Sequence, residues 1–238
     1  MPYSNSNKIK FCEAQRLFSA ARMCKYIHAC KSNEQLAVEL YSYNAQLSQA
    51  FFGVISLFEV VLRNAINEHY LKTLGENWIV NQAGIGGLLE HEAEDIALTK
   101  KIYDKEGCYS HDKMVGSFTF GFWTYLFTKR NYKIGGKTLL QIFPKRAKGT
   151  TQKIAYNDIT AIREFRNRIA HHEPICFDAN GTISTDYMYA HYNLIRTYLQ
   201  YMAVDVNQIE TLIIQPEEWL MKVQQIGENI KNMNPEVC

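Results

Sequence analysis

The residue types best suited to chemistry gather in one stretch, residues 163–174, which reads Arg-Glu-Phe-Arg-Asn-Arg-Ile-Ala-His-His-Glu-Pro. It holds three arginines, one asparagine and two adjacent histidines. Histidine can serve as a general acid or base near neutral pH, because its ordinary pKa is about 6.5. Arginine presents a fixed positive fork that complements a phosphate group. Together these residue types predict chemistry on a phosphate.

The spacing within this stretch separates polar from apolar side chains on a predicted helix. Asn167 and His171 are four residues apart and share one helix face, and Arg166 lies about 100° around the axis from Asn167. An apolar stripe is expected on another side: Ile154, Ile159, Ile162, Phe165 and Ile169. The helix can therefore bury one side while it presents Arg166, Asn167 and His171 on the other.

This polar set suits cleavage of an RNA phosphodiester without a metal ion or other cofactor. No cluster of Asp and Glu accompanies it, as a hard divalent cation would require. In RNA the 2′-hydroxyl is the nucleophile, so the protein needs only to move protons and stabilise charge. We expect a 2′,3′-cyclic phosphate and a 5′-hydroxyl as product ends. DNA lacks the 2′-hydroxyl and should resist cleavage.

A structural interpretation of the same residues is open as well. Arg166 and Arg168 could pair with nearby acids such as Glu164 and Glu173. The two histidines could cap the C-terminal end of the helix, where positive charge is favoured. Spacing alone does not choose between this interpretation and a catalytic one.

Apolar periodicity predicts that the elements around this stretch are helices. Residues 34–73 carry apolar side chains every three or four positions, which indicates one long helix or two nearly collinear ones, with Gly75 as a stop. The helix that bears the chemistry is expected at about 151–171, ended by Pro174. Further helices are predicted at 9–30, 88–106, 113–128, 187–204 and 217–231. The chain is therefore predicted to be all-α.

We expect a single α-helical domain over residues 1–238 with one continuous core and a C-terminal helical extension at about 205–238. The aromatic residues of segment 113–128 are expected to pack in this core rather than to stack on bases. In the long helix, Glu59, Arg63 and Asn64 are polar exceptions. Glu59 and Arg63 are four residues apart and can pair, either as a buried structural ion pair or within a site.

Charge is unevenly distributed along the chain. The formal net charge is only +2, yet residues 113–157 contain no Asp or Glu. The basic connector at 129–150 is expected to be a structured loop suited to backbone phosphates, with a simple solvated loop as the alternative. Its candidate RNA-binding residues are Lys129, Arg130, Lys133, Lys137, Lys145, Arg146 and Lys148.

Cysteine usage and the length of the apolar runs indicate a soluble protein of a reducing compartment. The six cysteines form no CxxC pair. Cys24, His28 and Cys30 leave a metal site conceivable, but buried reduced thiols are the preferred interpretation. The longest apolar run, residues 50–62, is interrupted by Glu59 and is too short to span a bilayer. We expect a cytoplasmic location and no membrane partner.

Three stretches resemble one protein family. Arg166-Asn167-x-x-x-His171 is similar to the Arg-x4–6-His signature of HEPN domains, and the surrounding FRNRIAHHEPI resembles the C-terminal motif of Abi-like (abortive infection) bacterial proteins. EVVLRNAI at residues 59–66, preceded by LYxxN at 40–44, and FTFGFW at 118–123 resemble the same family in the same order. The resemblance covers roughly residues 10–200.

The resemblance implies a HEPN-like helical bundle, here with additional N- and C-terminal helices. It also implies a role in antiviral defence against phage or in a toxin–antitoxin system, and metal-independent ribonuclease activity as in many HEPN relatives. In those relatives two motifs face each other across a dimer or between two domains. A homodimer is therefore expected, with RNA as the other partner and an antitoxin as a further one.

Residue roles also follow from the resemblance. Arg166 would stabilise the scissile phosphate and His171 would transfer protons. Asn167 would position the substrate or the histidine, and His172 would act as a support. Arg63-Asn64 followed by His69 fits the loose signature too, as a second half-site or as a buried network typical of the family. Pairing between Glu59 and Arg63 would favour the network. Some HEPN toxins carry a tyrosine as a modification target two residues after the histidine, where this chain has Glu173.

Two other functions compete with an endoribonuclease. The first is a non-catalytic RNA-binding protein that holds a small structured RNA through the basic residues of segment 129–148. The second is a defence sensor that binds only protein. RNA affinity and its dependence on salt separate these functions.

Overall fold

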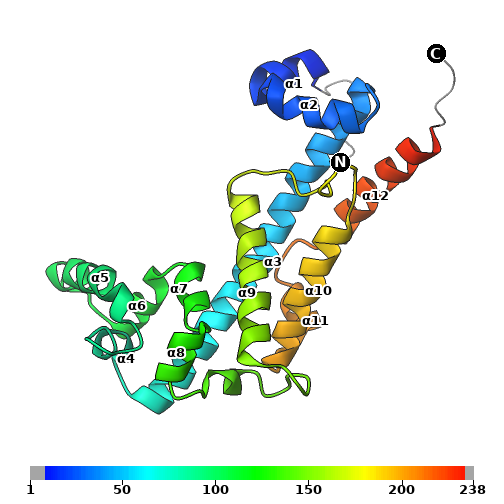
Figure 1. Cartoon of the computed structure of the whole chain (residues 1–238). Coiled ribbons are helices and arrows are strands. Elements are labelled where there is room, and N and C mark those ends of the chain that lie inside the picture. The colour runs from blue at the N-terminus through cyan, green and yellow to red at the C-terminus, as the bar shows by residue number, and fades with distance from the viewer. Residues whose placement is uncertain (1–8, 234–238) are drawn as a thin grey trace. The chain divides into compact units, whose positions relative to one another are not determined.

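A computed structural model describes residues 9–233, and all regular elements within this range are helices (Figure 1). An isolated antiparallel bridge between Phe177 and Ile183 is the one β-type pairing found there. The predicted all-α class is therefore confirmed. The HEPN-like arrangement of these helices stays a prediction.

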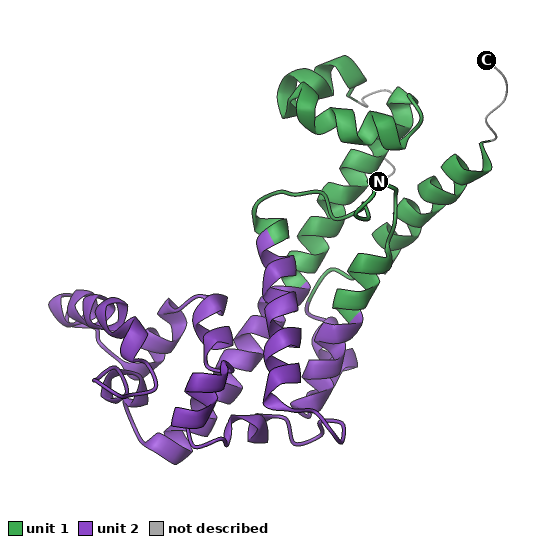
Figure 2. Cartoon of the chain, in the orientation of Figure 1, with its two compact units in different colours: residues 1–53, 168–192, 213–238 green, residues 54–167, 193–212 purple. Residues whose placement is uncertain are grey.

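The chain divides into two compact units, which are considered separately (Figure 2). Unit 1 comprises residues 1–53, 168–192 and 213–238, and unit 2 comprises residues 54–167 and 193–212. Three helices contribute residues to both units, because the chain passes from one unit to the other within α3 (Glu34–Leu74), within α9 (Gln152–Ala170) and within α10 (Asp186–Tyr201). The single domain over residues 1–238 stays a prediction.

The longest helix, α3, spans Glu34–Leu74 without a break, which confirms the helix predicted over 34–73. Gly75 follows it with a φ of 88°, so the predicted glycine stop is confirmed as well. Apolar side chains buried along α3 include Ala37, Leu40, Leu47 and Phe51 in unit 1 and Phe58, Leu62, Ile66 and Tyr70 in unit 2. Burial is confirmed at five positions that the apolar spacing named: Leu40, Leu47, Phe51, Val54 and Phe58. It is wrong at four others, which are only partly buried: Leu36, Tyr43, Val61 and Ala65.

By length and composition, α3 is also a helix that could cross a membrane. The core helix of a soluble protein has the same two properties. The expectation from the sequence rested on the shorter run of residues 50–62 alone. The cytoplasmic location stays a prediction.

Unit 1 begins with two helices where one was predicted over residues 9–30. α1 (Phe11–Phe18) ends at Ser19, whose φ of 77° interrupts the helix, and α2 (Ala20–Ala29) starts directly after it. The Ser19 side chain accepts a hydrogen bond from the backbone N–H of Arg22 at 3.3 Å. A serine N-cap thus restarts a helix that apolar spacing alone had made continuous. α12 (Glu217–Asn232) completes the unit and agrees with the prediction of a helix at 217–231.

Unit 2 contains most of the short helices. α4 is Trp78–Asn81, η2 is Glu90–Glu92 and α5 is Ala93–Lys105; α6 is His111–Ser117, α7 is Phe120–Tyr125, α8 is Lys129–Ile134 and η3 is Leu139–Ile142. Two longer helices lie partly in unit 2 and partly in unit 1: α9 is Gln152–Ala170 and α10 is Asp186–Tyr201. The short helix α11 is Val206–Glu210, in unit 2. The helix predicted over 113–128 is therefore two helices. The segment 129–150, predicted to be a loop, contains α8 and η3.

The segment that follows α9 is anchored to α3 inside unit 1. The Asn44 side chain, only 7% exposed, accepts hydrogen bonds from the backbone N–H groups of Ile175 at 2.8 Å and Cys176 at 3.2 Å. These donors are 131 and 132 residues away in the sequence. Asn44 therefore fixes the backbone that leads away from the motif-bearing helix.

We predict that Asn44→Leu lowers the free energy of unfolding by about 2–4 kcal/mol, because two buried N–H groups lose their acceptor. Urea unfolding followed by circular dichroism measures this change. Gln46→Leu is the matched control, since Gln46 is exposed on the same helix and should change stability by less than about 0.5 kcal/mol. Equal losses in the two variants would show that the Asn44 hydrogen bonds contribute little.

Candidate functional site

α9 positions the polar stretch by burying its apolar stripe. Ile159, Ile162 and Phe165 are completely buried, and Ile169 is 5% exposed. Ile154 is 46% exposed, so its predicted place in the buried stripe is wrong. The first turn of α9 therefore presents an apolar side chain to solvent, while the rest of the helix is packed as predicted.

The C-terminal end of α9 is a hydrogen-bonded cap, and Pro174 does not set it. The backbone N–H of His172 donates to the carbonyl of Ile169 at 2.9 Å, and the N–H of Glu173 donates to the carbonyl of Arg168 at 3.0 Å. This is the Schellman pattern, with His172 in the left-handed position at a φ of 57°. The helix ends at Ala170, four residues before the proline that was predicted to end it.

His172 contributes to this cap through its backbone. Its carbonyl accepts a hydrogen bond from the Arg22 guanidinium at 2.6 Å, within unit 1. Histidine is one of the residues that tolerate the left-handed region, although glycine is the usual choice there. His172 therefore acts as a structural support through its backbone, and the side chains of His171 and His172 are both exposed.

The contacts of Arg168 agree with the structural interpretation, in which the arginines of the motif pair with nearby groups. Its guanidinium donates to the Pro174 carbonyl at 2.6 Å and forms an ion pair with Glu173 at 3.8 Å. It also lies over the Tyr187 ring, 5.0 Å from the centroid. Arg168 is therefore engaged in holding the segment that follows α9.

Arg166 has a different environment, inside unit 2. Among the described residues it makes no ion pair with Glu164, and its charge acts instead on the carboxyl of Glu59. Burial raises the pKa of Glu59, and the positive charges of Arg166 and Arg63 partly offset this rise. The pairing of Arg166 with Glu164 is therefore wrong, and an interaction between α9 and α3 takes its place.

The predicted ion pair between Glu59 and Arg63 does not form. Both residues lie on α3 one turn apart, and the charge of Arg63 acts on Glu59. The Arg63 Nε is nevertheless buried without a hydrogen-bond partner. Two arginines therefore act on one half-buried carboxyl that forms an ion pair with neither of them. Such a group is suited to an anion.

Asn167, His171 and Asn64 are exposed. Asn167 belongs to unit 2 with Arg166, and His171 is the first residue after α9, in unit 1. The backbone of α9 and its cap runs continuously through all three positions of the motif. Exposure leaves both Asn167 and His171 accessible to a large substrate such as RNA.

His69 belongs to a buried network. It is 9% exposed, one of its ring nitrogens lies 2.9 Å from the Thr138 hydroxyl, and its ring meets Tyr70 edge-on. Burial lowers the pKa of His69, which favours its neutral form. Of the two interpretations left open for the loose Arg63–His69 motif, this environment favours a structural network at His69.

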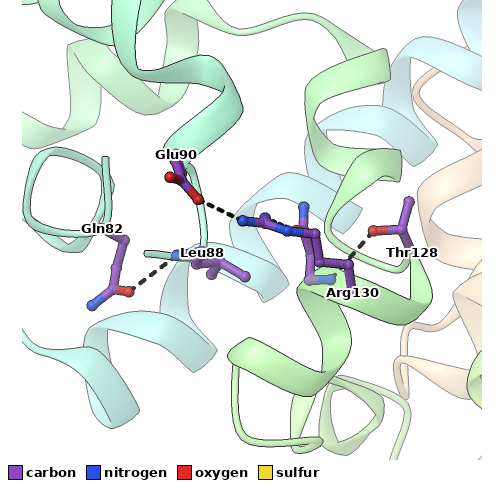
Figure 3. A network of polar contacts seen from close by, with 6 residues as sticks. Gln82, Leu88, Glu90, Thr128 and Arg130 are labelled. Atoms are coloured by element: carbon purple, nitrogen blue, oxygen red, sulfur yellow. Dashed lines mark hydrogen bonds and ion pairs between the residues drawn. The ribbon is translucent and has the colours of Figure 1, made fainter. Parts of the chain in front are cut away.

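The basic segment contains two arginines that stabilise its own fold. Arg130 forms an ion pair with Glu90 at 2.7 Å and also donates to the Asn131 side chain, as Figure 3 shows for the first of these interactions. Arg146 donates to the carbonyls of Leu140 at 3.0 Å and Phe143 at 3.2 Å. The lysines are exposed instead: Lys129, Lys133, Lys137, Lys145 and Lys148. These five remain the candidates for binding phosphates.

A pocket in unit 2 was missed by reasoning from sequence. Its volume is about 510 Å³, and its wall includes Arg163, three residues before Arg166 on α9. Phe118 and Phe122 also line it; Phe122 is buried as predicted, whereas Phe118 is only partly buried. Phe120 and Trp123 are buried as predicted. The glycine at position 121, between two phenylalanines, was the signal available in the sequence.

Within residues 9–233, no group of three or more His, Cys, Asp or Glu side chains is arranged to hold a metal ion. Cys24 is exposed and Cys30 is buried, so the two thiols lie in different environments. The described cysteines are all free thiols.

The chain matches no family model, and comparisons with curated proteins and with solved structures found no significant similarity.

The environment of Glu59 predicts a pH dependence of stability. Its folded-state pKa is raised from the ordinary 4.5, so the folded state binds more protons and stability falls as pH rises above about 4.5. Glu59→Gln removes this titration. We expect the stability of Glu59→Gln relative to the parent to increase from pH 4 to pH 7, as measured by urea unfolding at each pH.

Glu68→Gln is the matched control on the same helix and should show the opposite sign. The Lys72 hydrogen bond and charge lower the pKa of Glu68, so its stabilisation is present above the ordinary pKa and declines as pH falls. Parallel pH profiles for the two variants would contradict the description of the Glu59 site.

Proposed function

We propose that the chain is a metal-independent endoribonuclease that cleaves RNA by attack of the 2′-hydroxyl. The observation that carries the proposal is that the charges of Arg63 and Arg166 both act on the half-buried Glu59 carboxyl, while the Arg63 Nε has no hydrogen-bond partner. An RNA phosphate supplies the anion that this group lacks. Its transition state carries additional charge, which a pre-positioned guanidinium stabilises.

His171 is the proton-transfer residue in this proposal. It takes the proton of the 2′-hydroxyl, the 2′-oxygen bonds to phosphorus, and the bond from phosphorus to the 5′-oxygen breaks. The departing 5′-oxygen needs a proton from a second acid. A second copy of the chain would bring a second exposed histidine, which supports a homodimer as the active form. Asn167 is proposed to orient the phosphate or the histidine.

The three motifs shared with Abi-like proteins support a biological setting for this activity. We propose a cytoplasmic toxin or abortive-infection protein of the HEPN type, whose activity acts against phage. RNA is the substrate, and an antitoxin is the partner that such a toxin requires. The contacts of the motif are consistent with this role, because Arg168 and the His172 backbone hold the helix end while the His171 side chain stays exposed.

A second candidate function is a non-catalytic protein that holds a small structured RNA. It is favoured by the five exposed lysines of segment 129–148, which follow one another without an intervening acid. Lysine side chains that bind phosphates hold RNA without reading its sequence. This function requires neither His171 nor Arg166.

We predict that the purified protein cleaves single-stranded RNA in EDTA and that His171→Ala lowers the rate about 10²–10⁴-fold, because a general acid–base group is removed. Arg166→Ala should lower it by about 10²–10³-fold, since the charge that stabilises the transition state is removed. Rates are measured on a labelled oligonucleotide, with 2′,3′-cyclic phosphate ends identified by mass spectrometry.

Two controls accompany this measurement. His172→Gly preserves the left-handed backbone of the cap and should leave cleavage within a few-fold of the parent, about twofold to threefold. An oligonucleotide with a 2′-deoxy nucleotide at the cleaved position should resist. Cleavage that survives His171→Ala, or that occurs at the deoxy position, rules out the proposed site and mechanism.

We predict that changing Lys129, Lys133, Lys137, Lys145 and Lys148 to Gln weakens RNA binding and flattens its salt dependence. Each phosphate that the variant no longer neutralises should reduce the slope of log K against log salt by about 0.7–0.9. Fluorescence anisotropy at several salt concentrations measures the slope. The control changes five exposed lysines elsewhere: Lys10, Lys25, Lys101, Lys105 and Lys231. Equal slopes for the two variants would identify segment 129–148 as a solvated surface.

A further inference from the structure

The pocket beside Arg163 is formed entirely within unit 2. It has a volume of about 510 Å³, which falls in the size range of small-molecule sites. Side chains from α5, from α6 and α7 with the turn between them, and from α9 line it, and η2 contributes Glu92. The wall combines aromatic rings, hydroxyl groups and charges of both signs, which is the composition of a ligand site rather than of a core void.

Two charged groups in this wall have unmet hydrogen-bonding capacity. The Glu92 Oε2 and the Arg163 Nε are each buried without a partner. Burial also raises the pKa of Glu92. Among the described residues Glu92 and Arg163 form no ion pair with one another, and both residues line the pocket, although the two unpaired atoms are themselves enclosed by protein. Unpaired buried groups of this kind are costly, so either side chain gains a hydrogen bond when it turns toward a ligand in the pocket.

The aromatic part of the wall is a stacked pair. The rings of Phe118 and Phe122 are 4.2 Å apart between centroids with an interplanar angle of 14°. Gly121 lies beside them in the wall, and a Cβ built at this position meets only the Thr119 hydroxyl, at 3.5 Å. The space next to the rings is therefore open, and a flat ring system can extend the stack.

We propose that this pocket binds one guanine base of the RNA substrate, and the proposal rests on the ribonuclease function stated above. A guanine presents an acceptor, O6, next to two donors, N1–H and the N2 amino group. When the two side chains turn toward the ligand, Arg163 can donate to O6 and the Glu92 carboxylate can accept from both donors, while the phenylalanine pair can stack on the ring. Adenine, cytosine and uracil lack this order of one acceptor and two donors.

The position of Arg163 connects the pocket to the phosphate site. Arg163 and Arg166 are three residues apart on α9, a rise of about 4.5 Å along the helix axis. Both arginines belong to unit 2. A base held at Arg163 therefore leaves a neighbouring phosphate of the same strand within reach of Arg166. The pocket would select the nucleotide beside the cleaved bond.

The test measures equilibrium binding of GMP, AMP, CMP and UMP by calorimetry. We expect GMP to bind at least about tenfold more tightly than the other three. Gly121→Leu fills the pocket and should abolish GMP binding. Gly116→Leu is the matched control, because Gly116 is also helical, a Cβ added there would have no neighbour within 4 Å, and this glycine does not line the pocket.

Glu92→Gln is the second variant, and it tests selectivity without filling space. It replaces one acceptor oxygen with a donor, so GMP should lose its advantage over AMP. Equal binding of all four nucleotides to the parent, or GMP binding unchanged by both Gly121→Leu and Glu92→Gln, overturns the proposal.

Cleavage of two RNA oligonucleotides separates this proposal from the proposed function. One contains a single guanine in an adenine and uracil background, and the other contains none. If the parent cleaves at the guanine and Glu92→Gln does not, the result supports both the pocket and the ribonuclease. Cleavage without base preference overturns the pocket and leaves the ribonuclease intact. Selective GMP binding without any cleavage supports the pocket as a guanine-nucleotide site and overturns the ribonuclease.

Discussion

The arrangement on which the candidate site depends is one carboxyl under the charges of two arginines. Glu59 lies half-buried on α3, Arg63 lies one turn further along the same helix, and Arg166 reaches it from α9. Burial raises the pKa of Glu59, because it disfavours the ionised form of the carboxyl. This limits the negative charge that the carboxyl can place beside either guanidinium. The packing of α3 and α9 inside unit 2 positions Arg63 and Arg166. The proposed function uses this pre-positioning to stabilise a phosphate by electrostatic interaction.

The motif at the end of α9 contains residues with structural contacts next to residues without them. Arg168 is bonded to the Pro174 carbonyl, and His172 supplies the left-handed turn that closes the helix. The side chains of their neighbours Arg166 and His171 form no hydrogen bond that closes the helix end. The division follows from the physics of a helix end, whose last carbonyl groups need donors from the residues that come after them. A run of similar basic residues can therefore contain both supports and candidate catalytic groups.

Regular helices were predictable because burial imposes a period of 3.6 residues on the apolar side chains. This holds for α3, α9, α10 and α12, whose predicted bounds agree closely with the structure. The interruptions were not predictable from that period. At Ser19 the φ of 77° and a side-chain cap break a helix whose apolar spacing continues through the break, and at Phe118–Thr119 the chain leaves α6 in an extended conformation before α7 begins. Neither position carries a proline or glycine.

The sequence alone determined the all-α class, the motif Arg166, Asn167 and His171, and the excess of basic residues in segment 129–148. Tertiary structure decided which members of these sets are free. Glu90 engages Arg130 from 40 residues away, Thr138 bonds to His69 from 69 residues away, and Asn44 anchors Ile175 from 131 residues away. It also joined Arg166 to Glu59 and assembled the pocket at Arg163. Local periodicity determines helices because their hydrogen bonds link residues four apart, whereas charge pairing and pockets depend on interactions between helices that sequence spacing does not encode.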